Sequence, residues 1–123
     1  MSREEEIPPH IRQQILRLQQ LQQTLEIVLS ERQKIEAELV EINNAIEEIG
    51  KTTEDSIIYK LVGRIMIKSN KETLKNELME KKEIMETRAK VLEKQEERTR
   101  AQLTTLQKDL QKALSEAGIS ISS

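Results

Sequence analysis

The chain has 123 residues, of which 36% are hydrophobic and 34% are charged, and its formal net charge is −2. It has no Phe, Trp or Cys, and Tyr59 is its single aromatic residue. A compact core would therefore lack its usual large side chains. The absence of Cys excludes disulfides and thiolate metal sites. The balanced charge and the single aromatic residue offer nucleic acid neither a basic surface nor a stacking platform. No apolar run reaches the roughly 20 residues of a membrane span. We expect a cytoplasmic protein with no nucleic-acid or membrane partner.

Apolar residues recur at steps of three and four from Ile11 to Ile49, with Arg32 as a polar interruption. This spacing is the seam of a coiled coil and predicts a helix over residues 11–50, after a tail of residues 1–10. Pro8 and Pro9 are tolerated only in a first helical turn, and Gly50 favours the end of the helix. The seam consists of Ile11, Ile15, Leu18, Leu21, Leu25, Val28, Ile35, Leu39, Ile42, Ile46 and Ile49.

Residues 56–69 interrupt the helical pattern with β-branched side chains, and Gly63 supplies a turn, so they predict a β-hairpin. Both faces are apolar, and an isolated hairpin is marginal in water and has two open edges. Burying six or so of the aliphatic side chains is worth on the order of 10 kcal/mol gross. We predict that hairpins of several chains join into a shared sheet or barrel; the alternative is a cap folded against the chain's own helices. The predicted oligomerisation residues are Ile57, Ile58, Tyr59, Leu61, Val62, Gly63, Ile65, Met66 and Ile67.

A second helix is predicted over residues 70–117, with Ser69 or Asn70 as its N-cap and Gly118 at its end, followed by a tail of residues 118–123. It has the same kind of seam. The seam residues are Leu74, Leu78, Met85, Ala89, Leu92, Thr99, Leu103, Leu106, Leu110 and Ala113.

The two seams match in antiparallel register, from Ile46 with Leu78 to Ile11 with Ala113, because each step forward on one helix meets an equal step back on the other. At 1.5 Å per residue the helices are about 59 Å and about 68 Å long. We therefore predict a mainly α, single-domain chain: a long antiparallel two-helix coiled coil with the hairpin at the end opposite the termini. The alternative is a long parallel dimer with a second copy.

Three segments carry a resemblance to a known family: IPPHIRQQILRLQQLQQ, IYKLVGRIMIK and LEKQEERTRAQLTTLQKDLQKAL. They are similar to the β-type subunit of prefoldin, an archaeal co-chaperone also called GimC, over residues 7–115. The resemblance implies a heterohexamer of two α and four β subunits, in which hairpins form β-barrels and coiled coils project from that platform. It also implies that the coiled-coil tips hold unfolded client proteins without ATP and deliver them to a group II chaperonin. The acidic extension MSREEE has no role that we can assign.

At the end of the coiled coil that carries the termini, residues 11–25 face residues 99–113. Both segments have few charged residues in comparison with residues 71–100. Low charge reduces the cost of desolvation when an apolar client binds. Six aliphatic residues exceed the seam or lie beyond it, namely Ile7, Leu16, Leu29, Leu114, Ile119 and Ile121, and frayed ends expose seam residues transiently. The predicted client-binding residues are Ile7, Ile11, Ile15, Leu16, Leu110, Leu114 and Ile119. The alternatives are seam packing for Ile15 and disordered tails for Ile7 and Ile119.

No catalytic, metal or cofactor site is predicted. His10 has no ligand partners at metal spacing, and no Gly-rich loop is present to cradle phosphate. The carboxylates alternate with basic residues, as on a solvated helix face. We expect a protein that is not an enzyme. The competing function is a structural scaffold or tether that binds one defined partner without general holding of unfolded proteins.

Overall fold

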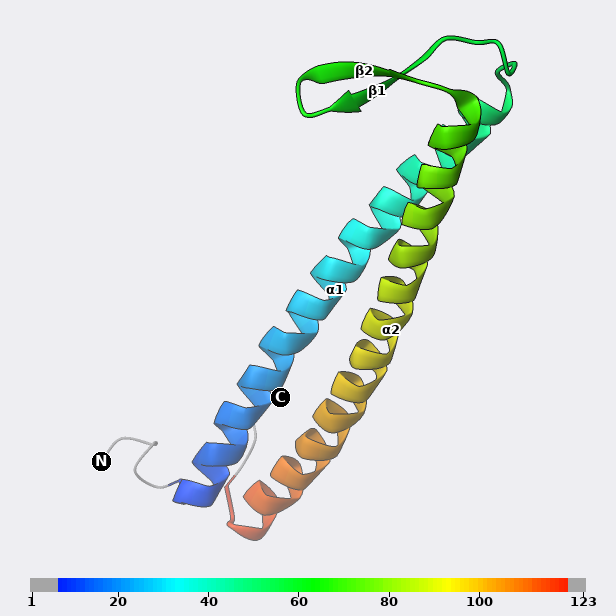
Figure 1. Ribbon diagram of the computed structural model, residues 1–123. Helices are drawn as coiled ribbons and strands as arrows, with labels where there is room; N and C mark the ends of the chain where they lie inside the picture. Colours follow the sequence, from blue (N-terminus) through cyan, green and yellow to red (C-terminus); the bar gives the residue numbers. More distant parts are fainter. Residues whose placement is uncertain (1–6, 120–123) are drawn as a thin grey trace. The chain divides into compact units, whose positions relative to one another are not determined.

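The computed structural model describes residues 7–119 as two long helices with an antiparallel hairpin between them (Figure 1). Helix α1 spans Pro9–Gly50, strands β1 and β2 span Ile58–Val62 and Ile65–Ser69, and helix α2 spans Lys71–Glu116. This confirms the predicted mainly α fold of two long helices with a hairpin between them. Helix α1 begins at Pro9 rather than Ile11 because a first-turn residue needs no amide donor and the fixed φ of proline suits that position. MSREEE and Ile121 lie outside the described residues.

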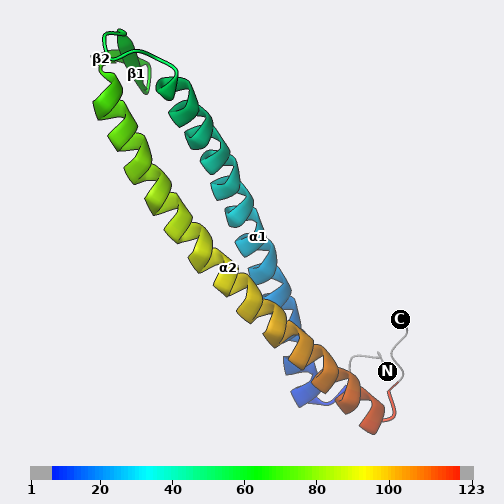
Figure 2. The same ribbon diagram turned by 90° about the vertical axis from the view of Figure 1, so that its right-hand side faces the viewer.

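The chain divides into two units, which we describe separately. The terminal unit comprises residues 1–31 and 92–123, and the hairpin unit comprises residues 32–91. Each unit contains one segment of α1 and one of α2, and Figures 1 and 2 show the two segments of each unit side by side and antiparallel. The helices therefore pair within one chain, and no second copy is needed to cover their seams.

Every predicted seam residue of both helices is buried or half-buried. In the terminal unit the buried seam residues are Ile11, Leu21, Val28, Thr99, Leu103 and Leu110; in the hairpin unit they are Ile35, Ile42 and Leu74. Because seams at steps of three and four keep one face of each helix toward its partner, the apolar pattern by itself identified the contact surface.

The hairpin closes through a two-residue loop, Gly63-Arg64, because Val62 pairs with Ile65. Gly63 has a φ of 60°, whereas Arg64 has a negative φ. A positive φ at the first central residue alone is the signature of a type II′ turn, whose twist matches that of the flanking strands. The position of the turn, which the sequence left uncertain by a residue or two, follows from this register.

Two short polar contacts lie at the helix ends that flank the hairpin. The Asn70 side-chain oxygen accepts a hydrogen bond from the Thr73 amide at 2.9 Å, which caps α2. The Lys71 ammonium donates to the Thr52 carbonyl at 2.7 Å and ties the connector after α1 to the start of α2. The connector is thus tied near its start to the first residue of α2.

Candidate functional site

The hairpin is the largest concentration of exposed apolar side chains in the described residues. Seven of the residues predicted for oligomerisation are between 48% and 69% exposed, and Ile58 is half-buried. The exposed set is Ile57, Tyr59, Leu61, Val62, Ile65, Met66 and Ile67. A contiguous patch of this kind is characteristic of interaction surfaces, because water around so much apolar area is unfavourable.

The two faces of the hairpin differ in their surroundings. Residues directly opposite in the register share a face, so Tyr59, Leu61 and Met66 lie on one side, and Lys60 and Ile67 lie on the other. The Lys60 ammonium lies 2.8 Å from a carboxylate oxygen of Glu77 on α2. The Lys60 face is therefore tied to α2 by an ion pair.

A groove of about 860 Å³ separates β1 from the helices of the hairpin unit. Its apolar lining includes Ile49 of α1 and Leu74, Leu78 and Met85 of α2, and the four consecutive β1 residues 58–61 form its other wall. The helices thus leave space beneath the hairpin instead of closing over it. The groove could not be found from the sequence, because Leu78 and Met85 are indistinguishable there from any other seam residue.

The own-helix cap, the alternative for this segment, does not describe the structure, since most apolar side chains of the hairpin stay exposed. The two strands pair only with each other in the part of the chain that the structure describes, so the outer edges of β1 and β2 are both open. Open edges and two apolar faces together make the hairpin a surface on which a further strand can pair.

The residues predicted for client binding occupy three different environments in the terminal unit. Ile11 is 0% exposed, and Leu110 and Leu114 are each 8% exposed; these three form one hydrophobic cluster. Ile7, Ile15 and Ile119 are half-buried and pack against that cluster. Leu16 alone is well exposed, at 58%. The structure therefore brings six of the seven together, as a closed cluster.

The expectation that Ile7, Leu114 and Ile119 are surplus to the packing is wrong. Helix α2 ends in a Schellman motif: the Ile119 amide bonds to the Leu114 carbonyl at 2.9 Å, the Gly118 amide bonds to the Ser115 carbonyl at 3.1 Å, and Gly118 has a φ of 74°. This reversal brings the Ile119 side chain back onto Leu114. Leu114 lies beside the seam, where the chain before α1 and the chain after α2 cover it.

Sequence reasoning missed Ile27, which is 64% exposed on α1. Leu16 and Ile27 are eleven residues apart, close to three helical turns, so they lie on one outward face of α1. Gln20 and Gln23 continue that face between them and are also exposed. The signal was present, because Ile27 falls next to the seam position Val28 and cannot face the partner helix with it.

No helix among residues 7–119 combines the length and the apolar character that crossing a membrane requires.

An antiparallel helix pair that carries an exposed apolar hairpin between its helices defines a class of chaperone subunits, the prefoldins. A family model described as "Prefoldin subunit" matches residues 12–117. Among curated relatives, the prefoldin subunit beta of Archaeoglobus fulgidus is 42% identical over 110 residues, which cover 89% of this chain and 95% of that protein. The prefoldin subunit beta of Sulfurisphaera tokodaii is 40% identical, with 89% and 88% of the two chains covered.

A solved structure agrees with these relatives. The crystal structure of the prefoldin beta subunit from Thermococcus strain KS-1 is similar with a TM-score of 0.80 and 36% identity, over 88% of this chain and 95% of that chain. The chain belongs to the prefoldin subunit family, and it is a co-chaperone subunit of the beta type. The competing scaffold function is not better supported by any of these similarities.

Proposed function

We propose that the hairpin joins the hairpins of companion subunits in a β-barrel platform, in a heterohexamer of two α-type and four β-type chains. In this proposal the terminal unit holds unfolded client proteins without ATP and passes them to a group II chaperonin. The observation that carries the proposal is the exposure of the hairpin's apolar residues on both faces. The cytoplasmic location expected from the sequence stays a prediction.

Assembly through the hairpin is supported by its open edges and by the groove beneath β1. A strand added to an edge pairs its backbone groups with the edge and places alternate side chains on each face. The β1 edge borders the groove lined by Leu74, Leu78 and Met85, so an incoming strand gains apolar contacts there as well as hydrogen bonds. These two gains together favour a shared sheet over a solitary hairpin.

Client binding in the terminal unit is supported by two surfaces. Leu16 and Ile27 offer apolar area directly on the outside of α1. The cluster around Ile11, Leu110 and Leu114 offers more when the helix ends fray, because ends open at a lower free energy than the middle of a helix. Assignment of the seven predicted residues to client binding stays a prediction.

The assembly proposal is tested by native mass measurement of the chain with and without an α-type subunit. A variant with Ile57→Ser, Leu61→Ser and Met66→Ser loses three exposed apolar side chains of the hairpin. Val40→Ser is the control, because Val40 is 59% exposed but lies on α1, outside the hairpin. We expect the parent and the control to form the hexamer and the hairpin variant to remain unassembled. Hexamer formation by the hairpin variant at parental concentrations would refute the proposal.

The holding proposal is tested by aggregation of several unrelated denatured proteins, followed by light scattering without nucleotide. A holding subunit suppresses aggregation of all of them, whereas a scaffold for one partner suppresses aggregation of none. Transfer is tested by adding a group II chaperonin with ATP and measuring recovery of native client. Recovery that is no greater with the chain than without it would contradict transfer.

A further inference from the structure

All charged residues of the hairpin are basic. Residues 56–70 include Lys60, Arg64 and Lys68 and no Asp or Glu, and all three basic residues are exposed. Lys60 has a counter-ion in Glu77. Arg64 and Lys68 have no ion-pair partner within residues 7–119. The hairpin therefore presents two uncompensated positive charges beside its exposed apolar side chains.

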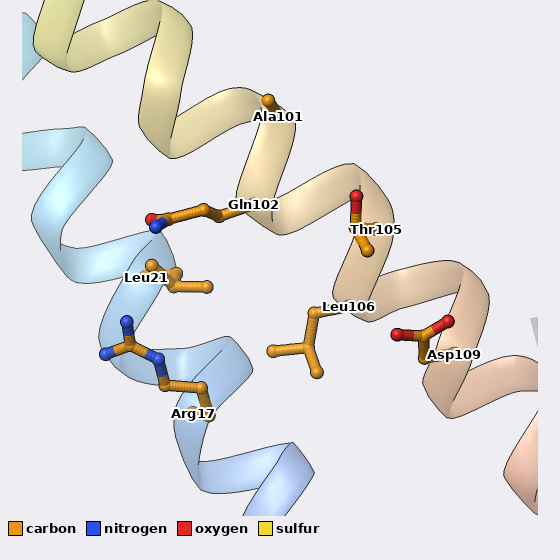
Figure 3. A pocket seen from close by; sticks show the side chains of 7 residues that line it. All are labelled: Arg17, Leu21, Ala101, Gln102, Thr105, Leu106 and Asp109. Carbon is orange, nitrogen blue, oxygen red and sulfur yellow. The ribbon is translucent and has the colours of Figure 1, made fainter.

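The helices, in contrast, carry charges of both signs. A groove of about 430 Å³ in the terminal unit, beside Leu106, is an example: its lining includes Arg17 of α1 and Asp109 of α2 (Figure 3). A second copy of this chain thus has carboxylates on its helices and in the connector before β1, but none on its hairpin. Pairing between two hairpins of this chain would bring only positive charges together.

The register of the hairpin determines which backbone groups point outward from β2. In a hairpin with a two-residue loop, the residues that flank the loop form a hydrogen-bonded pair, and hydrogen-bonded and non-hydrogen-bonded pairs then alternate along the strands. Val62 and Ile65 flank the loop, so the odd-numbered residues of β2 direct their N–H and C=O groups toward β1. The N–H and C=O groups of Met66 and Lys68 therefore lie at the outer edge, which is open in the described residues.

An antiparallel strand added to this edge forms hydrogen-bonded pairs with Met66 and Lys68. The residue directly opposite Lys68 lies on the same face of the sheet, with the two Cβ atoms about 5.5 Å apart. Opposite charges at this separation stabilise the pair, whereas like charges destabilise it. Lys68 and Met66 share the face of Tyr59. A strand that fits this face has a carboxylate opposite Lys68 and, as its next residue on that face, an apolar side chain opposite Met66.

A second copy of β2 does not supply this pattern. Antiparallel pairing with the greatest overlap of the two strands sets Lys68 opposite Met66 of the second copy. A shift of two residues, which keeps the hydrogen bonds of the edge, sets Lys68 opposite Lys68 in one direction and opposite Arg64 in the other. Because residues 56–70 contain no Asp or Glu, no pairing between two hairpins gives Lys68 a counter-ion.

We propose that the outer edge of β2 binds a strand of a different chain, one that places an Asp or Glu opposite Lys68 and an apolar residue opposite Met66. The Lys68 ammonium donates to the carboxylate and so favours this strand over a second copy, in which the ammonium would lose water without gaining a counter-ion. The inference rests on the proposed assembly through the hairpin, and it adds the edge that receives the companion and the chemistry of the companion strand.

The charge of Lys68 is tested by native mass measurement of the full-length chain titrated with an α-type subunit. Lys68→Met removes the charge and should weaken assembly several-fold, and Lys68→Glu reverses the charge and should weaken it further, by roughly tenfold. Lys75→Glu is the matched control, because it makes the same change in net charge at an exposed residue of α2 in the hairpin unit. Assembly of Lys68→Glu at the concentrations that suffice for Lys75→Glu would overturn the proposal.

The companion's half of the pair is tested by exchange of charges. Each Asp and Glu in the strands of the α-type subunit is changed to Lys in turn, and each variant is mixed with the parent chain and with Lys68→Glu. One of these variants should assemble several-fold more weakly with the parent but recover assembly with Lys68→Glu. Recovery with none of them would show that no carboxylate of the companion strands faces Lys68.

Occupation of the edge by a second copy has its own measurement. The chain has no cysteine, and the pairing of greatest overlap sets Ile67 opposite Ile67 at a closely spaced, non-hydrogen-bonded pair. Ile67→Cys would then form a disulfide between two copies, because the Cβ atoms come close enough. With the α-type subunit present we expect no more of this disulfide than from Val91→Cys, which has an exposed thiol on α2. A several-fold higher yield from Ile67→Cys would place a second copy on the edge and overturn the proposal.

The hairpin variant with Ile57→Ser, Leu61→Ser and Met66→Ser separates this inference from the proposed function. If that variant fails to assemble but the Lys68 variants assemble like the parent, the hairpin remains the assembly surface and the inference about its companion strand is wrong. If the hairpin variant itself assembles, the proposed assembly fails and the inference fails with it.

Discussion

The Lys60 ammonium on β1 lies 2.8 Å from a carboxylate oxygen of Glu77 on α2, and this is the ion pair that joins the hairpin to a helix in the described residues. The two side chains are 44% and 45% exposed. At that exposure water screens the attraction, so the pair contributes little to the free energy of unfolding. Its consequence is geometric, because it ties β1 to α2 at Lys60.

We predict that Lys60→Met and Glu77→Gln each lower the free energy of unfolding by less than about 1 kcal/mol, measured by urea denaturation followed by circular dichroism. Each should also weaken assembly with an α-type subunit, because the hairpin then samples more orientations. The exchanged pair, Lys60→Glu with Glu77→Lys, should restore most of the assembly. Failure of the exchange to restore it would show that the attraction between the two charges does not position the hairpin.

Gly63 should tolerate substitution far less well than its neighbour in the turn. Its φ of 60° is unfavourable for any L side chain, although no atom lies within 4 Å of the place that a Cβ would occupy, so the penalty comes from the backbone alone. We expect Gly63→Val to cost about 1–3 kcal/mol of local stability and to reduce assembly. Arg64→Val, at a negative φ, is the control. Nuclear magnetic resonance of residues 58–69 measures the loss of strand pairing, and similar spectra for both variants would contradict the turn assignment.

Two aliphatic residues of the first turns of α1, one in the terminal cluster and one outside it, should differ in their contribution to the free energy of unfolding. Ile11 is 0% exposed, so Ile11→Ala should lower the free energy of unfolding by about 2–5 kcal/mol through lost contacts and a residual cavity. Leu16 is 58% exposed, so Leu16→Ala should change it by less than about 0.5 kcal/mol. Thermal and chemical denaturation measure both values. Comparable losses would mean that the cluster around Ile11 is not a core.

The end of α2 should be sensitive to its glycine. Gly118→Ala places a methyl group at a φ of 74° and should cost about 1–2 kcal/mol, released in part by unwinding the Schellman motif and freeing Ile119. Ser115→Ala is the control, because the motif uses only the backbone carbonyl of Ser115. Amide hydrogen exchange at Gly118 and Ile119 reports the motif directly, and unchanged protection in the alanine variant would be inconsistent with this prediction.

The outward face of α1 should contribute to holding without contributing to folding. The double variant Leu16→Ser and Ile27→Ser should unfold at nearly the parental denaturant concentration but require a several-fold higher molar ratio to suppress aggregation of a denatured protein. Val91→Ser serves as the control, since Val91 is 52% exposed on α2 in the hairpin unit. A double variant that holds as well as the parent would remove this face from the client-binding surface.

Much of the fold could be predicted from the sequence because a coiled coil is specified by a local, periodic signal. Steps of three and four residues from Ile11 to Ile49 determine which face of α1 is buried, and the matching seam of α2 determines the antiparallel register. The hairpin could be predicted as well, since β-branched residues and Gly63 replace the helical pattern over residues 56–69. Its two apolar faces also indicated that the hairpin cannot bury its own side chains.

The environment of the predicted client-binding residues was decided by tertiary structure. Sequence spacing showed that Leu16, Leu114 and Ile119 lie off the seam, but it could not distinguish the exposed Leu16 from the buried Leu114. Leu114 is covered because the chain reverses at Gly118 and returns Ile119 to the end of the helix. This contact depends on the path of the chain after α2, which the periodic spacing of apolar residues within the helices does not encode. The grooves beside Leu78 and Leu106 depend in the same way on which side of the seam is left open. Periodicity specifies the contact face of a helix, whereas the exposure of residues flanking that face depends on where neighbouring segments lie in space.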